Sequence, residues 1–149
     1  RPAVFQNTWV PTKSAQLYSP VIHEEVMMDH RDKLSHIFEM QNAFDTALCE
    51  KRDLSHITRQ EWMQKEILAM LSELSELLDE VRFKWWKNET PMNEEAAKEE
   101  LVDILHFFTS MCLKMGMDAD ELYRRYLDKN KENFDRQKGR SDRDGYEWE

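Results

Sequence analysis

The fold is decided by residues 68–108, whose sequence is LAMLSELSELLDEVRFKWWKNETPMNEEAAKEELVDILHFF. Two acidic pairs, Glu73 with Glu76 and Glu100 with Asp103, each lie three residues apart within a segment of apolar helical periodicity. This spacing places both carboxylates of a pair on one helical face, about 5–6 Å apart at Cβ. Because only a short polar break separates the segments, we expect two antiparallel helices that bring the four carboxylates together.

The remaining sequence predicts an all-α fold. Only three glycines and four prolines occur, and three of the prolines fall in the first 20 residues. Such long periodic segments with few breakers are typical of helices. We expect an extended arm over residues 1–19 and one domain over 20–149, with a four-helix-bundle-like core of antiparallel helices. The expected helices cover residues 20–49 with a break near 29–32, 58–86, 93–116, and 118 through 134.

Charge and composition narrow the classes of partner. Acidic residues outnumber basic ones 30 to 21, and the formal net charge of −9 argues against a nucleic-acid partner. No apolar run approaches about 18 residues, so we expect no membrane span and no secretion signal. The two cysteines, Cys49 and Cys112, are too few for a disulfide framework and favour reduced thiols in a cytoplasmic protein.

Projection at about 100° per residue separates the acidic side chains. The apolar arc of the later helix is centred on Leu101, Leu105, Phe108 and Cys112. Glu100 projects inside this arc and Asp103 just beyond it, where a carboxylate is costly unless it is paired or bound to metal. In the earlier helix, Glu73 lies at the apolar margin, whereas Glu76 and Glu80 lean toward solvent.

Clustered carboxylates without a nearby Cys and His pair suit Mg²⁺ or Mn²⁺ rather than zinc. Mg²⁺ commonly completes its coordination with phosphate oxygens and water, so the cluster is a candidate site for phosphate hydrolysis. Acidic residues at helical spacing are more often a solvated face. A non-catalytic helical module that binds a partner therefore stays open as an alternative.

Four blocks of sequence match a known family in the same order. They are MQNAFD at 40–45, LSELSELLDEVRFKWW at 71–86, EELVDILHF at 99–107 and YLDKNKENFDRQ at 126–137. Together they resemble the dimeric dUTPase family, which belongs with the MazG-like proteins to the all-α nucleoside triphosphate pyrophosphatases. The resemblance covers roughly residues 34–146. It implies a homodimer that hydrolyses dUTP to dUMP and pyrophosphate, and a MazG-like enzyme acting on dCTP or dGTP is the alternative.

The resemblance also implies roles for individual residues. The implied Mg²⁺ ligands are Glu73, Glu76, Glu100 and Asp103, and Glu73 is the candidate to orient or deprotonate the attacking water. The implied phosphate ligands, which share one face of the last helix, are Lys129, Asn133 and Arg136. The implied contacts to base and sugar are Gln41, Asn42, Asp45, Trp86 and Phe107. His106 projects away from the acidic pairs, and we interpret it as a packed or supporting residue.

Overall fold

The structure is a computed structural model that describes residues 32–141. The arm expected at 1–19, the first part of the expected first helix and the last residues of the domain lie outside this range. The described residues form four helices: α1 (Lys33–Arg52), α2 (Arg59–Glu80), α3 (Glu94–Lys114) and α4 (Ala119–Gln137). They contain no strand, so the predicted all-α fold is confirmed. None of these helices is long and apolar enough to cross a membrane.

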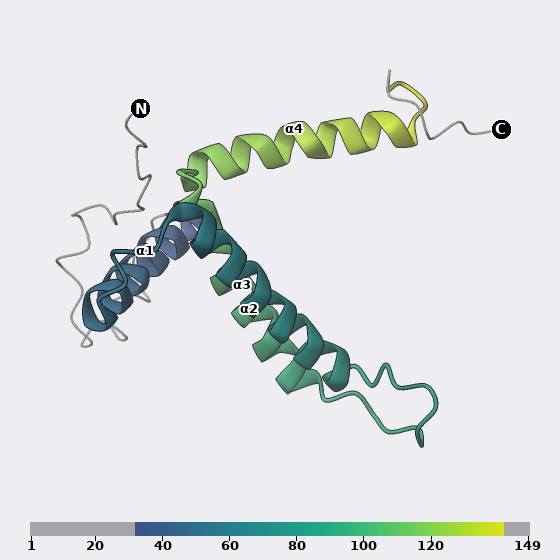
Figure 1. Cartoon of the computed structure of the whole chain (residues 1–149). Coiled ribbons are helices and arrows are strands. Elements are labelled where there is room, and N and C mark those ends of the chain that lie inside the picture. Colours follow the sequence, from purple (N-terminus) through teal and green to yellow (C-terminus); the bar gives the residue numbers. More distant parts are fainter. Residues whose placement is uncertain (1–31, 142–149) are drawn as a thin grey trace, which may run out of the picture.

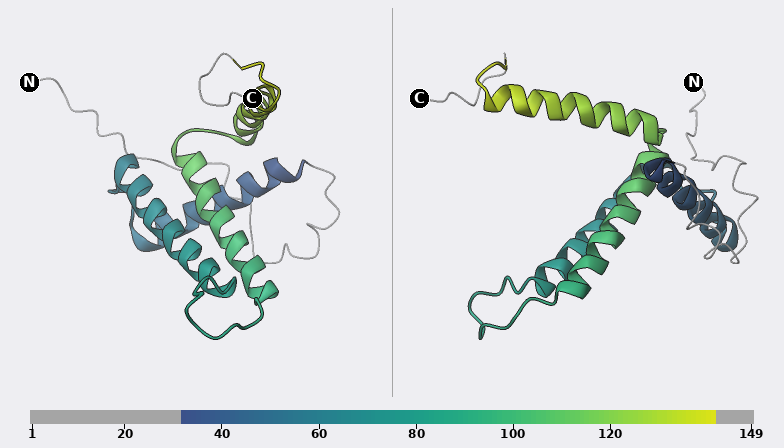
Figure 2. Two further views of the ribbon diagram at one scale, coloured as in Figure 1. Left: turned by 90° about the vertical axis from the view of Figure 1, so that its right-hand side faces the viewer. Right: turned by 180° about the vertical axis from the view of Figure 1, so that it is seen from behind.

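Helices α2 and α3 lie antiparallel and make the most extensive helix–helix contact among the described residues (Figure 1). Helix α1 crosses this pair and packs on α3. Helix α4 starts from the same end of the molecule, contacts α1 and then projects away from the α2–α3 pair, as both views in Figure 2 show. The described residues therefore form a body of three helices from which the fourth extends.

Local capping explains where these helices begin. A capping box at Thr58 opens α2: its hydroxyl accepts from the Glu61 backbone N–H at 3.3 Å, and the Glu61 carboxylate accepts from the Thr58 backbone N–H at 2.8 Å. Asn93 caps α3 through the Ala96 N–H at 3.4 Å. Asp118 caps α4 in the same manner.

Helix α2 ends at Glu80, so the predicted continuation to Trp86 is wrong. Arg82 takes a left-handed backbone conformation with φ of 58°, which interrupts the helix without a glycine. Its guanidinium Nε donates to the carbonyl oxygen of Pro91 at 3.1 Å, across the connection. This contact holds the chain in a wide loop over residues 81–93.

The three-helix body is joined by a buried ionic network. Lys114 of α3 is 1% exposed, and its Nζ lies 3.1 Å from Asp45 of α1 and 2.9 Å from Glu66 of α2. Ser110 lies between these groups, and its hydroxyl oxygen is within hydrogen-bonding distance of all three. The ammonium also lies 4.7 Å from the ring centroid of Trp62. A small apolar cluster of Phe38, Cys112 and Ala119 packs beside this network. We call the hydrogen-bonded group of Asp45, Glu66, Ser110 and Lys114 the Lys114 network.

The predicted apolar face of α3 is not covered by the described chain. Of the predicted apolar arc only Cys112 is buried, whereas Leu101 is 56% exposed and Leu105 and Phe108 are also exposed. The outer stripe, as we call this apolar surface of α2 and α3, consists of Ile67, Leu68, Leu71, Leu74, Leu78, Leu101, Leu105 and Phe108. Both cysteines are free thiols, as predicted, and burial raises the pKa of Cys112.

Replacing Lys114 by Ala is expected to destabilise the protein by about 3–5 kcal/mol, because two buried carboxylates lose their cation. Urea unfolding followed by circular dichroism measures this change. Lys98→Ala is the control, because its ion pair with Glu95 is exposed and should contribute at most about 1 kcal/mol. Equal effects of the two substitutions would contradict a structural role for the network.

Candidate metal centre

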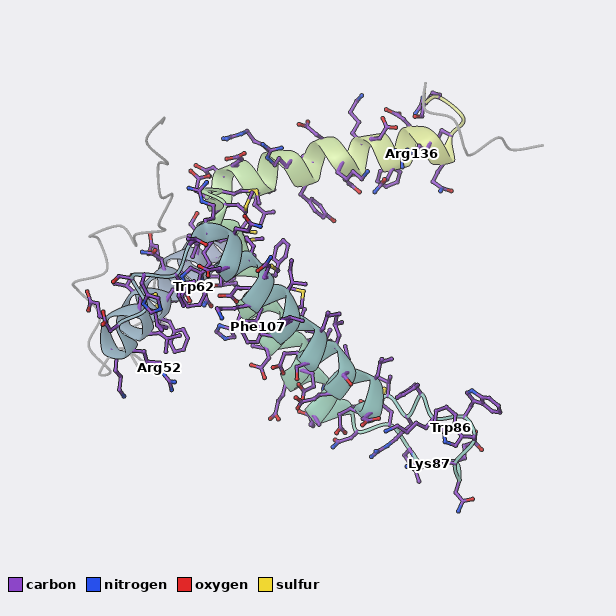
Figure 3. All side chains as sticks on the ribbon, in the orientation of Figure 1. Arg52, Trp62, Trp86, Lys87, Phe107 and Arg136 are labelled. Carbon is purple, nitrogen blue, oxygen red and sulfur yellow. The ribbon has the colours of Figure 1, made fainter. Side chains whose placement is uncertain are left out.

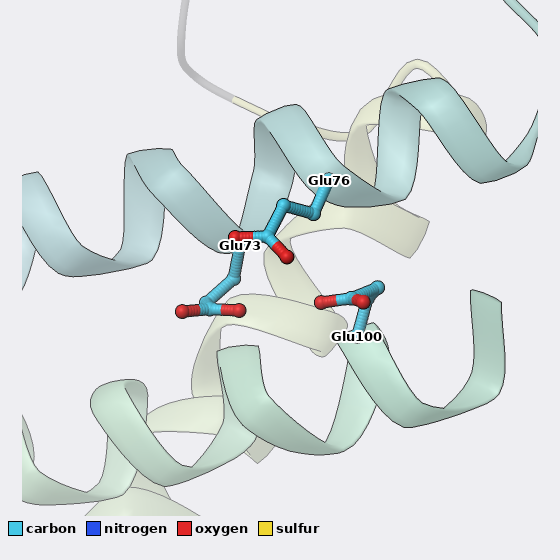
Figure 4. A group of neighbouring side chains, drawn as sticks. All are labelled: Glu73, Glu76 and Glu100. Carbon is cyan, nitrogen blue, oxygen red and sulfur yellow. The ribbon is translucent and has the colours of Figure 1, made fainter. Parts of the chain in front are cut away.

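Three carboxylates converge where α2 and α3 lie side by side. Glu73 and Glu76 come from α2 and Glu100 comes from α3, and one oxygen of each lies within 4.8 Å of the others. Figure 4 shows the three side chains turned toward one another across the helix pair. Glu73 and Glu100 are half-buried, whereas Glu76 is exposed. The antiparallel pairing predicted from residues 68–108 is what brings them together.

Negative charges repel one another in this cluster. Partial desolvation raises the pKa of Glu100, and the neighbouring charge of Glu76 raises it further. A hydrogen bond with Glu73 and the charges of Glu73 and Asp103 act in the same direction. The cluster can relieve this repulsion by holding a proton or a cation. Its all-carboxylate ligand set fits a hard divalent cation.

Asp103 contributes its charge to this site but is not one of the three converging ligands. Its side chain is exposed on α3, and it acts on Glu100 through its negative charge. Glu80, expected to face solvent, is instead half-buried, and its Oε2 has no hydrogen-bond partner among the described residues. Glu73 and Glu80 are seven residues apart on α2, so both lie along the face that meets α3.

The predicted phosphate ligands do not join the carboxylates within this chain. Lys129, Asn133 and Arg136 lie on α4, which leads away from the α2–α3 pair, and Figure 3 shows Arg136 near its far end. Arg136 Nε pairs with Glu132 at 3.0 Å. The shared face predicted for these residues lies on a single helix, but that helix is remote from the acidic cluster.

The predicted base contacts on α1 are buried in hydrogen bonds. Gln41 and Asp45 are each 5% exposed, and Gln41 Nε2 donates to Asp45 at 2.8 Å. Asn42 is half-buried, and its backbone carbonyl accepts from Thr46 at 2.7 Å. Asp45 therefore neutralises Lys114 rather than offering a free oxygen to a ligand.

The two predicted aromatic walls lie in different places. Trp86 is 59% exposed in the 81–93 connection, where its ring meets Phe83 and Trp85 edge-on (Figure 3). This loop encloses a hollow of about 1070 Å³ beyond the end of α2. Phe107 is half-buried on α3, about one turn beyond Asp103.

A second site lies on α1 and α3, where Gln41 is a predicted base contact and His106 a predicted packed or supporting residue. A pocket of about 420 Å³ lies between these helices, with mainly apolar walls and four polar side chains, His36, Gln41, His106 and Thr109. His106 Nδ1 lies 2.7 Å from Gln41 Oε1. The partners are 65 residues apart in sequence, so no local spacing could have predicted the contact.

Comparison with known proteins agrees with this architecture. A sequence model described as dUTPase matches residues 33–118, which is more than half of the chain. The chain belongs to the dUTPase family. The match includes α1, α2 and α3 and ends where α4 begins. It thus covers all of the converging carboxylates of this dUTPase-family chain and leaves Lys129, Asn133 and Arg136 outside.

Two curated relatives are named for dCTP rather than dUTP. The dCTP pyrophosphatase of Enterobacteria phage T4 is 36% identical over 87 residues, which cover 49% of this chain and 51% of the relative. The dCTP pyrophosphatase of Enterobacteria phage LZ5 is 34% identical over 74 residues, which cover 50% of this chain and 43% of the relative. The chain thus spans about half the length of these relatives. No solved structure matches it significantly.

Glu100→Gln is expected to change how stability depends on pH in metal-free buffer. Because the pKa of Glu100 is raised in the folded state, this group stabilises the fold at pH values below the ordinary glutamate pKa of 4.5. That stabilisation is lost as the pH rises through the raised pKa. The neutral amide does not ionise, so the Tm of the variant should gain on that of the wild type between acid and neutral pH. Thermal melts in EDTA across this range measure the difference.

The same melts test the cation. Adding MgCl₂ at neutral pH should raise the Tm of the wild type and leave Glu100→Gln nearly unchanged. A pH-independent difference, together with equal responses to MgCl₂, would show that Glu100 neither titrates nor binds metal as described.

Proposed function

We propose that this chain is a Mg²⁺-dependent nucleotide pyrophosphohydrolase that converts dUTP and water to dUMP and pyrophosphate. The observation that carries the proposal is the convergence of Glu73, Glu76 and Glu100 within 4.8 Å at the α2–α3 seam. Membership of the dUTPase family supports the reaction class. The names of the phage T4 and LZ5 relatives favour dCTP as a second candidate substrate.

The acidic residues have different proposed roles at this site. Glu73, Glu76 and Glu100 would hold Mg²⁺, with Asp103 adding negative charge beside them. When bound, the ion would neutralise phosphate charge and acidify a water ligand. Mn²⁺ meets the same ligand preference. Glu73, half-buried at the seam, is the proposed catalytic residue and would orient or deprotonate the attacking water.

A homodimer would supply the cations that this site lacks in one chain. The outer stripe and the apolar side of α4 both expose large apolar side chains, with Tyr126 64% and Phe134 57% exposed, and such surfaces often mark protein–protein contacts. We propose that a second copy covers both surfaces. Its α4 would then bring Lys129, Asn133 and Arg136 toward the phosphates bound at the first copy's carboxylates.

Recognition of base and sugar is proposed for the pocket between α1 and α3 beside Gln41, with Asn42, Trp86 and Phe107 as further contacts. Trp86 is exposed in the loop beyond α2, so it can reach a ligand bound outside the helix pair. Phe107 shares α3 with Glu100 and Asp103 and could pack on deoxyribose. Gln41 and Asp45 would act behind these residues, because their polar atoms already have partners.

A nucleotide panel with and without Mg²⁺ tests the proposed reaction. Pyrophosphate release should require Mg²⁺ and prefer dUTP over dTTP, dCTP, dGTP and UTP. A preference for dCTP would support the second candidate, and release from none of these nucleotides would favour the non-catalytic alternative. Glu100→Gln should lower kcat/KM by about 100-fold or more, because a ligand of the cation is lost.

The control for that variant is Glu95→Gln. Glu95 is also an α3 carboxylate, but it is exposed and pairs with Lys98 instead of facing α2. It removes the same charge and should leave kcat/KM nearly unchanged. Full activity of Glu100→Gln would refute the assignment of the site.

Light scattering after size-exclusion chromatography tests the homodimer. The wild type should have the mass of two chains, and Leu71→Asp with Leu101→Asp should yield the mass of one, because charge is placed on the outer stripe. Both leucines are about half exposed in the single chain, so its helical content should not change. A monomeric wild type would refute the dimer.

A further inference from the structure

Buried hydrogen bonds connect the Lys114 network to the pocket between α1 and α3. Asp45 Oδ2 accepts from Lys114 at 3.1 Å and from Ser110 at 2.5 Å. Its other oxygen, Oδ1, accepts from Gln41 Nε2 at 2.8 Å. Gln41 Oε1 then lies 2.7 Å from His106 Nδ1. Four residues thus form one continuous chain from a buried ammonium to a ring that lines the pocket.

Charge gives this chain a direction. The ion pair with Lys114 holds Asp45 as a carboxylate, which can only accept hydrogen bonds. Gln41 must therefore turn its amide nitrogen toward Asp45 and its oxygen toward His106. Because that oxygen also only accepts, Nδ1 of His106 must carry the hydrogen. In the neutral ring, Nε2 is then an acceptor.

We infer that Lys114 and Asp45 are positioning residues that hold His106 as a fixed hydrogen-bond acceptor on the α1–α3 pocket. Nε2 of His106 has no hydrogen-bond partner within residues 32–141. Gln41, by contrast, uses both ends of its amide inside the protein and does not offer them to a ligand. Of the two residues that end this hydrogen-bonded chain, His106 is thus the one with a ring atom available to a ligand, and His36 and Thr109 are the other polar residues that line the pocket.

The pocket fits a flat ring with an N–H group on its edge. Its volume of about 420 Å³ lies in the usual range for small-molecule sites. Its apolar walls are Ile37, Met40, Phe44, Val102 and Leu105. A nucleobase has two apolar faces that would pack on these walls. Uracil N3–H and the cytosine amino group can each donate a hydrogen bond to Nε2 of His106. This assignment of the ligand rests on the proposed function, whereas the direction of the hydrogen bonds does not.

The tautomer of His106 tests the positioning chain without any substrate. Nitrogen-detected NMR on the full chain, labelled with ring-¹⁵N histidine at about pH 8.5, should show His106 protonated at Nδ1 and bare at Nε2. His106→Gln identifies its signals among the five histidines. The Nε2–H tautomer, or a mixture of both, would overturn the inference.

Two matched variants test the direction imposed by charge. Asp45→Asn can accept or donate toward Gln41, so the amide can turn and His106 should become a mixture of tautomers. Glu66→Gln removes a negative charge beside the same lysine but does not touch Gln41, so His106 should keep its Nδ1–H form. An unchanged tautomer in Asp45→Asn would overturn the inference. Should this variant fail to fold, Gln41→Leu removes the acceptor alone and should release the tautomer.

Calorimetry with a non-hydrolysable α,β-imido dUTP and its N3-methyl derivative tests the pocket. Methylation should weaken binding to the wild type and Glu66→Gln by about 10–100-fold, and Asp45→Asn should lose most of this discrimination. Equal binding of the two compounds to the wild type would overturn the assignment of the pocket. Absence of pyrophosphate release with any nucleotide would refute the proposed function and would leave the tautomer result standing.

Discussion

The ion pairs of Lys114 hold the three-helix body in register. A 1% exposed ammonium must keep its carboxylates close, because separating a buried charge from its partner is strongly unfavourable. Glu66 lies seven residues before Glu73 on α2, and Ser110 lies ten residues after Glu100 on α3. The network and the acidic cluster are therefore about two to three turns, or 10–15 Å, apart along the helix pair. The Lys114 network fixes the relative position of α2 and α3 at one end. Because the helices are rigid, it also sets their relative position at the acidic cluster.

These two clusters differ in their charge balance. At the first, Asp45 and Glu66 share the ammonium of Lys114. At the second, Glu73, Glu76 and Glu100 have no lysine or arginine partner within residues 32–141, and Glu100 responds with a raised pKa. The same pair of helices thus carries a neutralised, buried acidic pair at one end and, further along, a half-exposed acidic cluster that no basic side chain of the described residues neutralises. This contrast favours a bound cation over a purely structural role for the second cluster.

Sequence alone could predict what depends on neighbouring residues. The helix starts at Thr58 and Asp118 follow from side chains three residues away, and the acidic pairs follow from one short connection. The end of α2 was missed because Arg82 is held by Pro91, which lies across a loop without a glycine signal. The link between Asp45 and Lys114 joins residues 69 apart, beyond any periodicity. Periodicity also found the apolar face around Leu101 but could not tell what covers it.

The uncovered face and the extended helix have one explanation in common. Leu71 and Leu101 repeat with the regularity of a core position, yet about half of each side chain is exposed. Helix α4 has its own apolar side, and it meets the described body mainly through α1 and through the apolar cluster at Ala119. Either surface alone could be incidental, but one self-complementary association would bury both and would place basic side chains near an acidic centre that has none. The charge pattern therefore points in the same direction as the apolar surface: a site completed between two chains.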